Sequence, residues 1–483
     1  DCAAGNTTGS DTITLPTATF TFTASYTDVN GLNALPLINS TIIIDGNNAI
    51  FSRSSGAPSF RFMQIITGGN LTINNLTLTG GRAGESPEVG GAIRNWGTLT
   101  INDSTLSNNT SDAGGAIYNQ NGTTTIANTL FLNNTSLGNF VSPVYGGGAL
   151  HNNAGTLAIT SNTIISANTS ARDGSGIYSV DGILTINQAD IYYNTGAGNG
   201  GGLLSLRNLT TITATTIAHN TATWGAGLYN ESDFLSLTRS TIAYNQTLDT
   251  TDGGGLYLRN SDAYISNSTF SQNRALNDGG GIYIHSGAAF IENSTIYANQ
   301  ADSGAGGGIF RFAPDFADIY NTIVASSTLS TDCSGGVGAI GTNLDTDGTC
   351  GASITADPNL GPLGYHNSTI LVHPLLIVGT VSPALDAGTN AVCNNSRVNN
   401  IDQRGVSRTN QDGNEDGGTD GNPCDLGAYE RQLTDPTTIT LGQTNTTPLT
   451  TITLTIITII TLATLTLLTL SQHYPQPAPT NKN

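Results

Sequence analysis

The chain has 483 residues, a formal net charge of −19 and only 10% charged residues. The acidic balance excludes a nucleic-acid binder of the usual kind, which needs a basic face, and it argues against docking by charge on an anionic membrane. Lys482 is the single lysine, so chemistry that depends on lysine, such as a Schiff base or a P-loop, is nearly excluded.

Composition points to an all-β chain. Threonine, asparagine, serine and glycine dominate the sequence, and all four are weak helix formers. Short β-branched runs are broken by Gly, Asn and Asp, which is typical of strands joined by turns. We expect residues 1–40 to cap the N-terminal end of this array, because a stack of strands would otherwise expose a raw edge.

A repeat of about 26 residues follows and dominates residues 41–325. Most of its units begin with a glycine pair, and they include GGAIYNQNGTTTIANTLFLNN from Gly114 and GGIYIHSGAAFIENSTIYAN from Gly280. Each unit holds three strand-like pieces and no helical segment, which predicts a right-handed parallel β-helix with one unit per coil. Alternation along the strands predicts that Ile117, Ile126 and Leu130 face inward.

An asparagine closes each unit at a similar place. Stacked asparagine side chains can bond to one another along the axis of such an array. The sequence therefore predicts an internal asparagine ladder, with these members in its best-defined part: Asn194, Asn220, Asn245, Asn273 and Asn299.

Residues 326–432 depart from the repeat and are rich in Cys, Gly and Asp. We expect them to form a C-terminal cap stapled by disulfides. Proximity favours Cys333 with Cys350 and Cys393 with Cys424, although the sequence alone allows other pairings. Cys2 is left over, and no CxxC motif or Cys/His pattern indicates zinc.

The motifs resemble two kinds of bacterial surface protein. The GGAI and GGGL motifs followed by an STI piece and Asn are similar to the repeats of chlamydial polymorphic outer-membrane proteins and related adhesins. The motifs ADPNLGPL, SPALDAG, DQRGVSR and CDLGAYE resemble choice-of-anchor Q domain proteins over roughly residues 10–432. The resemblance implies an exported β-helix followed by an anchor, with no assigned catalytic residues.

Residues 433–483 form a Thr/Ile-rich tail with an uncharged run over 449–470, long enough to span a membrane as a helix. Alternation of Thr with Ile and Leu favours a strand instead. Three packings stay open: on the chain's own β-helix, in lipid, or on a neighbouring copy by strand addition. The residues expected to carry assembly are Thr451, Ile452, Leu454, Ile456, Ile457, Ile459, Ile460, Leu462, Leu465 and Leu467.

Two aspartates, Asp252 and Asp278, occupy the same register on adjacent coils. Two stacked carboxylates repel unless they are protonated or bridged by a cation, so the pair is a candidate Ca²⁺ site. The alternative interpretation is that Asp simply favours these turns. No other cofactor is expected.

These patterns together favour a non-enzymatic, exported structural protein at the cell surface. It would be adhesive or would assemble head to tail with copies of itself through the tail, and surface glycans are a further candidate partner. A polysaccharide lyase or hydrolase on a lateral face is the alternative from the enzyme class. A monomeric adhesin anchored in a membrane is the third hypothesis, and it requires a helical tail.

Overall fold

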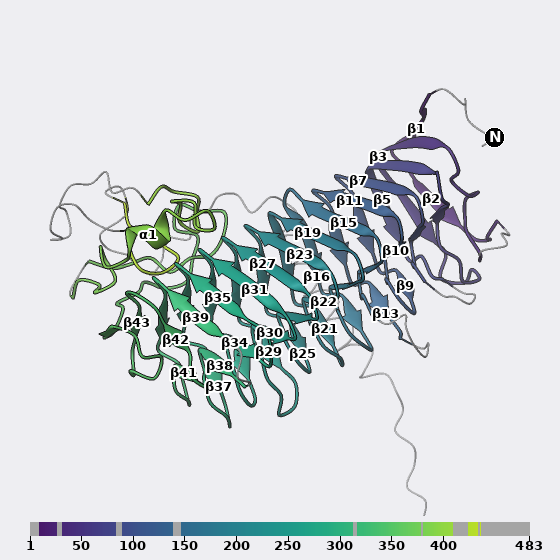
Figure 1. The fold of residues 1–483 in the computed structure, drawn as a ribbon. Coiled ribbons are helices and arrows are strands. Elements are labelled where there is room, and N and C mark those ends of the chain that lie inside the picture. Colours follow the sequence, from purple (N-terminus) through teal and green to yellow (C-terminus); the bar gives the residue numbers. More distant parts are fainter. Residues whose placement is uncertain are drawn as a thin grey trace, which may run out of the picture. The chain divides into compact units, whose positions relative to one another are not determined.

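The computed structural model describes residues 9–26, 31–83, 89–138, 146–312, 316–377, 380–408, 424–432 and 435. All of these residues belong to one compact unit, Asp1–Thr437. Within them, short parallel strands stack coil upon coil, and the one helix is α1 (Asn390–Cys393) (Figure 1). Cys2 and the tail residues 436–483 lie outside the described residues, so the predictions about them stay predictions.

The largest sheet has 25 strands, arranged as two columns that are joined by the long strands β3 (Thr41–Arg53) and β5 (Asn70–Thr79). The first column contains β1 (Asp11–Thr14), β7 (Thr98–Asn102), β11 (Thr123–Ala127), β15 (Thr156–Thr160), β19 (Ile183–Asn187), β23 (Leu209–Thr213), β27 (Phe234–Thr238), β31 (Asp262–Ser266), β35 (Ala289–Glu292), β39 (Ala317–Tyr320) and β42 (Gly338–Ala339). The second contains β2 (Thr19–Phe22), β8 (Thr105–Ser107), β12 (Leu130–Leu132), β16 (Thr163–Ser166), β20 (Ala189–Tyr192), β24 (Thr216–Ala218), β28 (Thr241–Ala243), β32 (Thr269–Ser271), β36 (Thr295–Tyr297), β40 (Ile323–Ala325), β43 (Leu344–Asp345) and β44 (Ile354–Thr355).

Two further sheets close the coils. An 11-stranded sheet contains β4 (Met63–Ile65), β6 (Ile93–Asn95), β10 (Ile117–Gln120), β14 (Leu150–Asn153), β18 (Ile177–Val180), β22 (Leu203–Leu206), β26 (Leu228–Glu231), β30 (Leu256–Arg259), β34 (Ile282–Ile284), β38 (Ile309–Arg311) and β41 (Cys333–Ser334). An eight-stranded sheet contains β9 (Thr110–Ser111), β13 (Thr135–Ser136), β17 (Thr169–Ser170), β21 (Thr195–Gly196), β25 (Thr221–Ala222), β29 (Gln246–Thr247), β33 (Arg274–Ala275) and β37 (Gln300–Ala301).

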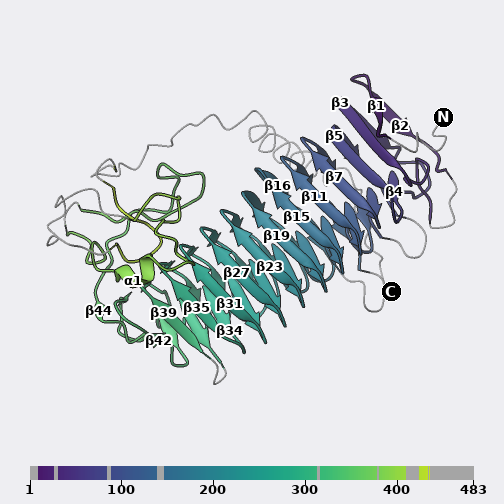
Figure 2. The ribbon, with the colours of Figure 1, turned by 45° about the horizontal axis from the view of Figure 1, so that its top comes forward.

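Like residues stack on like along the axis. Ile126 pairs with Ile101 on one side and with Ile159 on the other, and all three are fully buried. One hydrophobic cluster runs without a break from Ile38 to Cys350. Full burial of an aliphatic side chain contributes about 1.5–3 kcal/mol, so this continuous column of Ile and Leu stabilises the stack of coils. Figure 2 shows the strands of successive coils lying one beside another along the axis.

Each complete coil holds one strand more than the three pieces predicted. A two-residue strand follows the ladder asparagine, as β21 follows Asn194. The residue before that asparagine adopts a left-handed backbone, for example Tyr193 at φ 56°, which turns the chain sharply enough to begin a new strand. A similar turn at Asn128 (φ 46°) resets the alternation in β12.

That turn overturns one inward assignment. Ile117 and Ile126 are buried as predicted, but Leu130 is only half-buried and Phe131 is fully buried in its place. The prediction for Leu130 was wrong because it carried the alternation of β11 through a turn that interrupts it.

Strands extend beyond the repeat on both sides. Before residue 41, strands β1 and β2 already pair in parallel with β3. After residue 325, strand β42 pairs with β39 and strand β43 pairs with β40. The disulfide pairing favoured by proximity is confirmed, since Cys333 bonds to Cys350 and Cys393 bonds to Cys424. Cys333 and Cys350 are buried within the main hydrophobic cluster.

The segment after residue 360 runs back along the outer face of the second column. Gln403 donates from Nε2 to Thr241 Oγ1 at 2.8 Å and accepts from Thr269 Oγ1 at 2.6 Å. Further along, the main-chain N–H of Ala428 donates to Thr295 Oγ1 at 3.0 Å. Threonines 241, 269 and 295 share one register on β28, β32 and β36, so a hydroxyl column of the β-helix forms the docking surface for this segment.

Candidate functional site

The predicted ladder asparagines lie one above another inside the β-helix. In each step the Nδ2 of one asparagine donates to the Oδ1 of the next at 3.0 Å, and the main-chain N–H of the first donates to the same oxygen at 2.9–3.1 Å. All are fully buried. The steps continue back through Asn168 and Asn134 to Asn109. Because each amide is satisfied on both sides, this polar column can lie inside an apolar core.

A second internal ladder was missed from the sequence. Asn95 Nδ2 donates to Asn119 Oδ1 at 2.8 Å, and Asn119 Nδ2 donates to Asn152 Oδ1 at 2.7 Å. The signal was present in the sequence, because an asparagine stands third in the strand motifs IRN, IYN and LHN. Serines 179 and 205 take this register on the next two coils, which made the pattern less regular.

An exposed stack of aromatic rings lies beside the asparagine ladder. Tyr193, His219 and Tyr244 stand directly before ladder asparagines on three successive coils. Ring centroids are 4.9 Å apart between Tyr193 and His219, and 4.7 Å apart between His219 and Tyr244, with interplanar angles of 13° and 2°. Tyr193 is 55% exposed and His219 is also exposed, whereas Tyr244 is half-buried. Partial burial in the stack lowers the pKa of His219.

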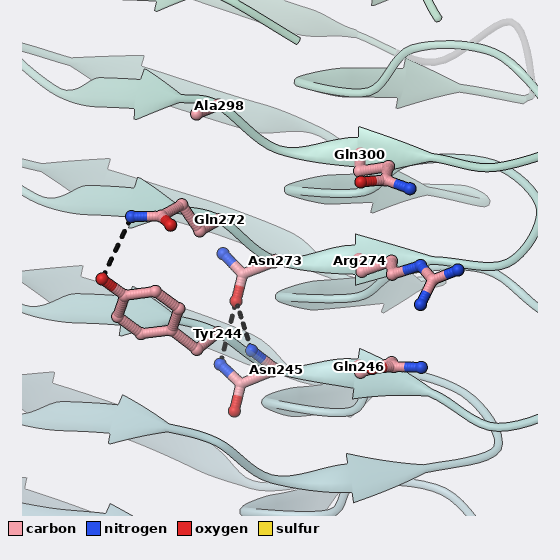
Figure 3. Close-up of a pocket in the computed structure, with 8 residues that line it drawn as sticks. All are labelled: Tyr244, Asn245, Gln246, Gln272, Asn273, Arg274, Ala298 and Gln300. Carbon is pink, nitrogen blue, oxygen red and sulfur yellow. Dashed lines mark hydrogen bonds between the residues drawn. The ribbon is translucent and has the colours of Figure 1, made fainter. Parts of the chain in front are cut away.

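A pocket of about 330 Å³ lies at the C-terminal side of this stack. One wall comes from the positions that continue the ring column, Tyr244, Gln272 and Ala298, and the other from the first residues of β29, β33 and β37. Figure 3 shows the two rows, with ladder residues between them. Gln272 donates from Nε2 to the Tyr244 hydroxyl at 3.0 Å. The pocket therefore presents amide, hydroxyl and guanidinium groups on rigid strands.

The charge in the pocket is balanced locally. Arg274 donates to Asp302 through Nε at 2.9 Å and through Nη2 at 2.5 Å, and Gln300 donates from Nε2 to the same carboxylate at 2.7 Å. The Arg274 hydrogen bonds lower the pKa of Asp302. Guanidinium and carboxylate thus neutralise each other at the rim.

Asp252 and Asp278 have structural hydrogen bonds in this fold. Asp252 Oδ1 accepts the main-chain N–H of Asp278 at 3.0 Å and Asn277 Nδ2 at 2.7 Å. Asp278 Oδ1 accepts the main-chain N–H of Ala305 at 2.7 Å. Burial raises the pKa of Asp252. Among the residues that the structure describes, no group of three or more His, Cys, Asp and Glu is placed to hold a metal ion, so the calcium site stays a prediction.

Another aromatic column runs along the 11-stranded sheet and is buried. His151 lies between Tyr118 and Tyr178, with ring centroids 4.7 Å away on both sides. Burial lowers the pKa of His151 to about 4, so the ring is neutral at pH 7. Tyr229, Tyr257 and Tyr283 continue the column at spacings of 4.9 and 4.8 Å. These rings are buried and pack against one another, so their role is structural.

Buried contacts between arginines and carboxyl groups hold the C-terminal segment. Arg404 Nε donates to Asp402 Oδ2 at 2.8 Å, and Arg408 Nη1 lies 3.2 Å from Glu430 Oε2. Arg408 also donates to Asn267 Oδ1 of the β-helix at 2.9 Å. Burial raises the pKa of Asp425 to about 7 and also raises that of Glu430, which lies beside it.

The ten predicted assembly residues between 451 and 467 lie outside the described residues, so the role of the tail stays a prediction. In the described part of the chain, no helix is long and apolar enough to cross a membrane.

Comparison with known proteins identifies the repeat. Residues 147–324 match the family described as a right handed beta helix region, and residues 103–120 match the Chlamydia polymorphic membrane protein repeat. No curated protein and no solved structure matches the chain. The resemblance to choice-of-anchor Q domain proteins stays a prediction. The protein has the fold of a right-handed parallel β-helix, and its residues 103–120 are similar to the repeat of polymorphic membrane proteins.

Proposed function

We propose that this protein is a non-enzymatic, surface-exposed β-helix that acts as an adhesin-like structural protein outside the cell. The observation that carries the proposal is the polymorphic membrane protein repeat at residues 103–120. Its glycine–aliphatic–tyrosine strand motif at Gly114 returns as GSGIY, GAGLY, GGLY and GGIY in later coils. The resemblance thus extends beyond the matched residues to the repeating unit itself.

The ionisable groups of the lateral faces support this proposal. Asp181 pairs with Arg207, Asp302 pairs with Arg274, and Asp252 accepts the main-chain N–H of Asp278. Each of these acids stabilises neighbouring coils. General acid–base hydrolysis needs two carboxyl groups that face one substrate, whereas these three acids are engaged in contacts between coils.

Surface labelling tests the proposal. Antibodies raised against the purified chain should label intact, unpermeabilised cells of the source organism, and external protease should remove that labelling. Permeabilisation should add little signal. Labelling that appears only after permeabilisation would overturn the surface assignment.

Self-assembly through the tail is a separate part of the proposal. Alternating Thr and Ile residues in 451–460 favour a strand that adds to a sheet of another copy. Deleting residues 438–483 should leave the coils folded and abolish concentration-dependent association measured by light scattering. Association that is unchanged in the truncated chain would contradict the tail's role and leave the surface assignment intact.

A further inference from the structure

We propose that the pocket beside Tyr244 binds a neutral sugar residue of a glycan. The proposal rests on the adhesin-like function and names the chemical class of its partner. It is carried by the ring stack, the pocket that follows the stack, and the balance of charge at the pocket rim.

The ring stack occupies strained backbone positions. Tyr193, His219 and Tyr244 have φ between 55° and 56°, in the left-handed region that bulky residues seldom adopt. Asn133 and Ala167 fill the same position on earlier coils, so the fold does not require an aromatic residue there. The left-handed turn belongs to every coil, so the bulky aromatic side chains at this position, and not the turn itself, are the reason to look for a function.

The hollow arises because the side chains in this column become shorter. After the three rings, the next coils carry Gln272 and then Ala298 at the same left-handed position. The column thus steps down from Tyr244 to a methyl group beside Gln246, Arg274 and Gln300. Its volume of about 330 Å³ lies at the lower end of the range for small-molecule sites, about 300–1,000 Å³.

The polar groups suit a ligand with many hydroxyls. Within the described structure, no side-chain hydrogen bond engages the Gln246 amide, and the Gln272 amide uses only its Nε2, toward Tyr244. Each amide still offers an N–H donor and a carbonyl acceptor. Sugar hydroxyls also donate and accept, so they match these amides. The tyrosine ring beside them supplies an apolar surface for the C–H groups of a sugar.

Charge selects a neutral glycan over an acidic one. Arg274 is the cation of the pocket wall, and Asp302 neutralises it through two hydrogen bonds. The chain as a whole carries a net charge of −19, which repels anions. A phosphate or uronate would therefore meet no net positive charge in this pocket.

Binding of labelled hexasaccharides to the full chain tests the proposal. The probes are neutral hexamers of glucose, galactose, mannose and xylose in their common linkages, with an oligogalacturonate hexamer as the acidic comparison. We expect at least one neutral probe to bind and the acidic probe not to bind. Gln272→Ala should weaken binding about tenfold, because it removes one set of hydrogen bonds.

Two further variants separate the pocket from general effects. Ala298→Gln fills the hollow with a side chain that Gln272 already shows to be compatible with this backbone, so it should abolish binding without unfolding the protein. Asn133→Ala changes the equivalent position far from the pocket and should leave binding unchanged. Circular dichroism would confirm that each variant is folded.

The proposal is overturned if the wild-type chain binds none of the neutral probes, or if Ala298→Gln binds as tightly as the wild type. Its failure is distinct from failure of the proposed function. If cells displaying the chain adhere equally with Ala298 or Gln at this position, the surface function stands and the sugar pocket does not. If the chain binds sugar but is found only inside cells, the reverse holds.

Discussion

Asn220 donates from Nδ2 to Oδ1 of Asn245 at 3.0 Å, and its main-chain N–H donates to the same oxygen at 2.9 Å. One side chain of each coil therefore satisfies both a side chain and the main chain of the coil before it. The coil repeat depends on this double contact, since it connects successive turns where the backbone leaves the regular strands.

Asn220→Ala should lower stability markedly. The change orphans two buried donors of Asn194, each of which costs about 1–3 kcal/mol when unsatisfied, so we expect a loss of about 2–5 kcal/mol. Urea unfolding followed by circular dichroism measures it. Asn187→Ala, a half-buried asparagine of β19, is the matched control and should change stability by about 0.5 kcal/mol or less. Equal effects in the two variants would contradict the ladder's role.

Ala167→Gly should be less costly than Ala158→Gly. Both alanines are half-buried, but Ala167 has φ 54° whereas Ala158 lies in the regular strand β15. Glycine relieves the left-handed strain of about 1–2 kcal/mol only at residue 167, while both variants share the entropic cost of glycine. The urea midpoint of Ala167→Gly should therefore be higher than that of Ala158→Gly. A lower midpoint for Ala167→Gly would show that this position carries no strain.

His151→Phe should remove part of the acid sensitivity of the fold. The folded protein holds the pKa of His151 near 4 through burial, whereas the unfolded chain takes up a proton near pH 6.5. Stability is thus present above pH 6.5 and is lost as pH falls toward 4, by about 3 kcal/mol for this residue. Phenylalanine keeps the ring between Tyr118 and Tyr178. The free energy of unfolding, measured from pH 7 to pH 4, should therefore fall less steeply with pH in the variant. An identical slope in the two proteins would refute the lowered pKa of His151.

Glu430→Gln should reduce the loss of stability that occurs as the pH rises. Burial raises the pKa of Asp425 to about 7 and raises that of Glu430, so the folded state keeps protons that the unfolded chain releases near pH 4. Stability is present below pH 4 and is lost as pH rises toward and beyond 7. Glutamine keeps an acceptor for Arg408 and removes one titrating carboxyl, which should flatten this loss.

Asp181→Asn is the control for that measurement. Its hydrogen bond to Arg207 lowers the pKa of Asp181, so its contribution changes below pH 4 and should leave the slope between pH 5 and pH 8 unaltered. Proteolysis of the C-terminal segment and urea unfolding, both followed against pH, would report the effect. A Glu430→Gln slope equal to that of the wild type would contradict the buried acid pair.

Much of the architecture is readable from residue types and spacing. A parallel β-helix is predicted by three recurring features: the glycine pairs, the Ile and Leu positions such as Ile126, and the asparagines. Each of these residues contacts only its own coil or a neighbouring one, so its pattern is visible in the sequence. The disulfides of Cys333 and Cys393 also follow from proximity along the chain. The second asparagine ladder was readable in principle, but serines 179 and 205 interrupt it.

The sequence by itself thus determined the coil, its period and its internal stacking, since these depend on contacts one repeat apart. Only the tertiary structure decided the rest. Gln403 reaches back over more than 160 residues to Thr241, and no local pattern encodes that contact. The pocket beside Tyr244 likewise exists because Gln272 and Ala298 continue its column on later coils, and the register that aligns them is set by packing of the whole stack.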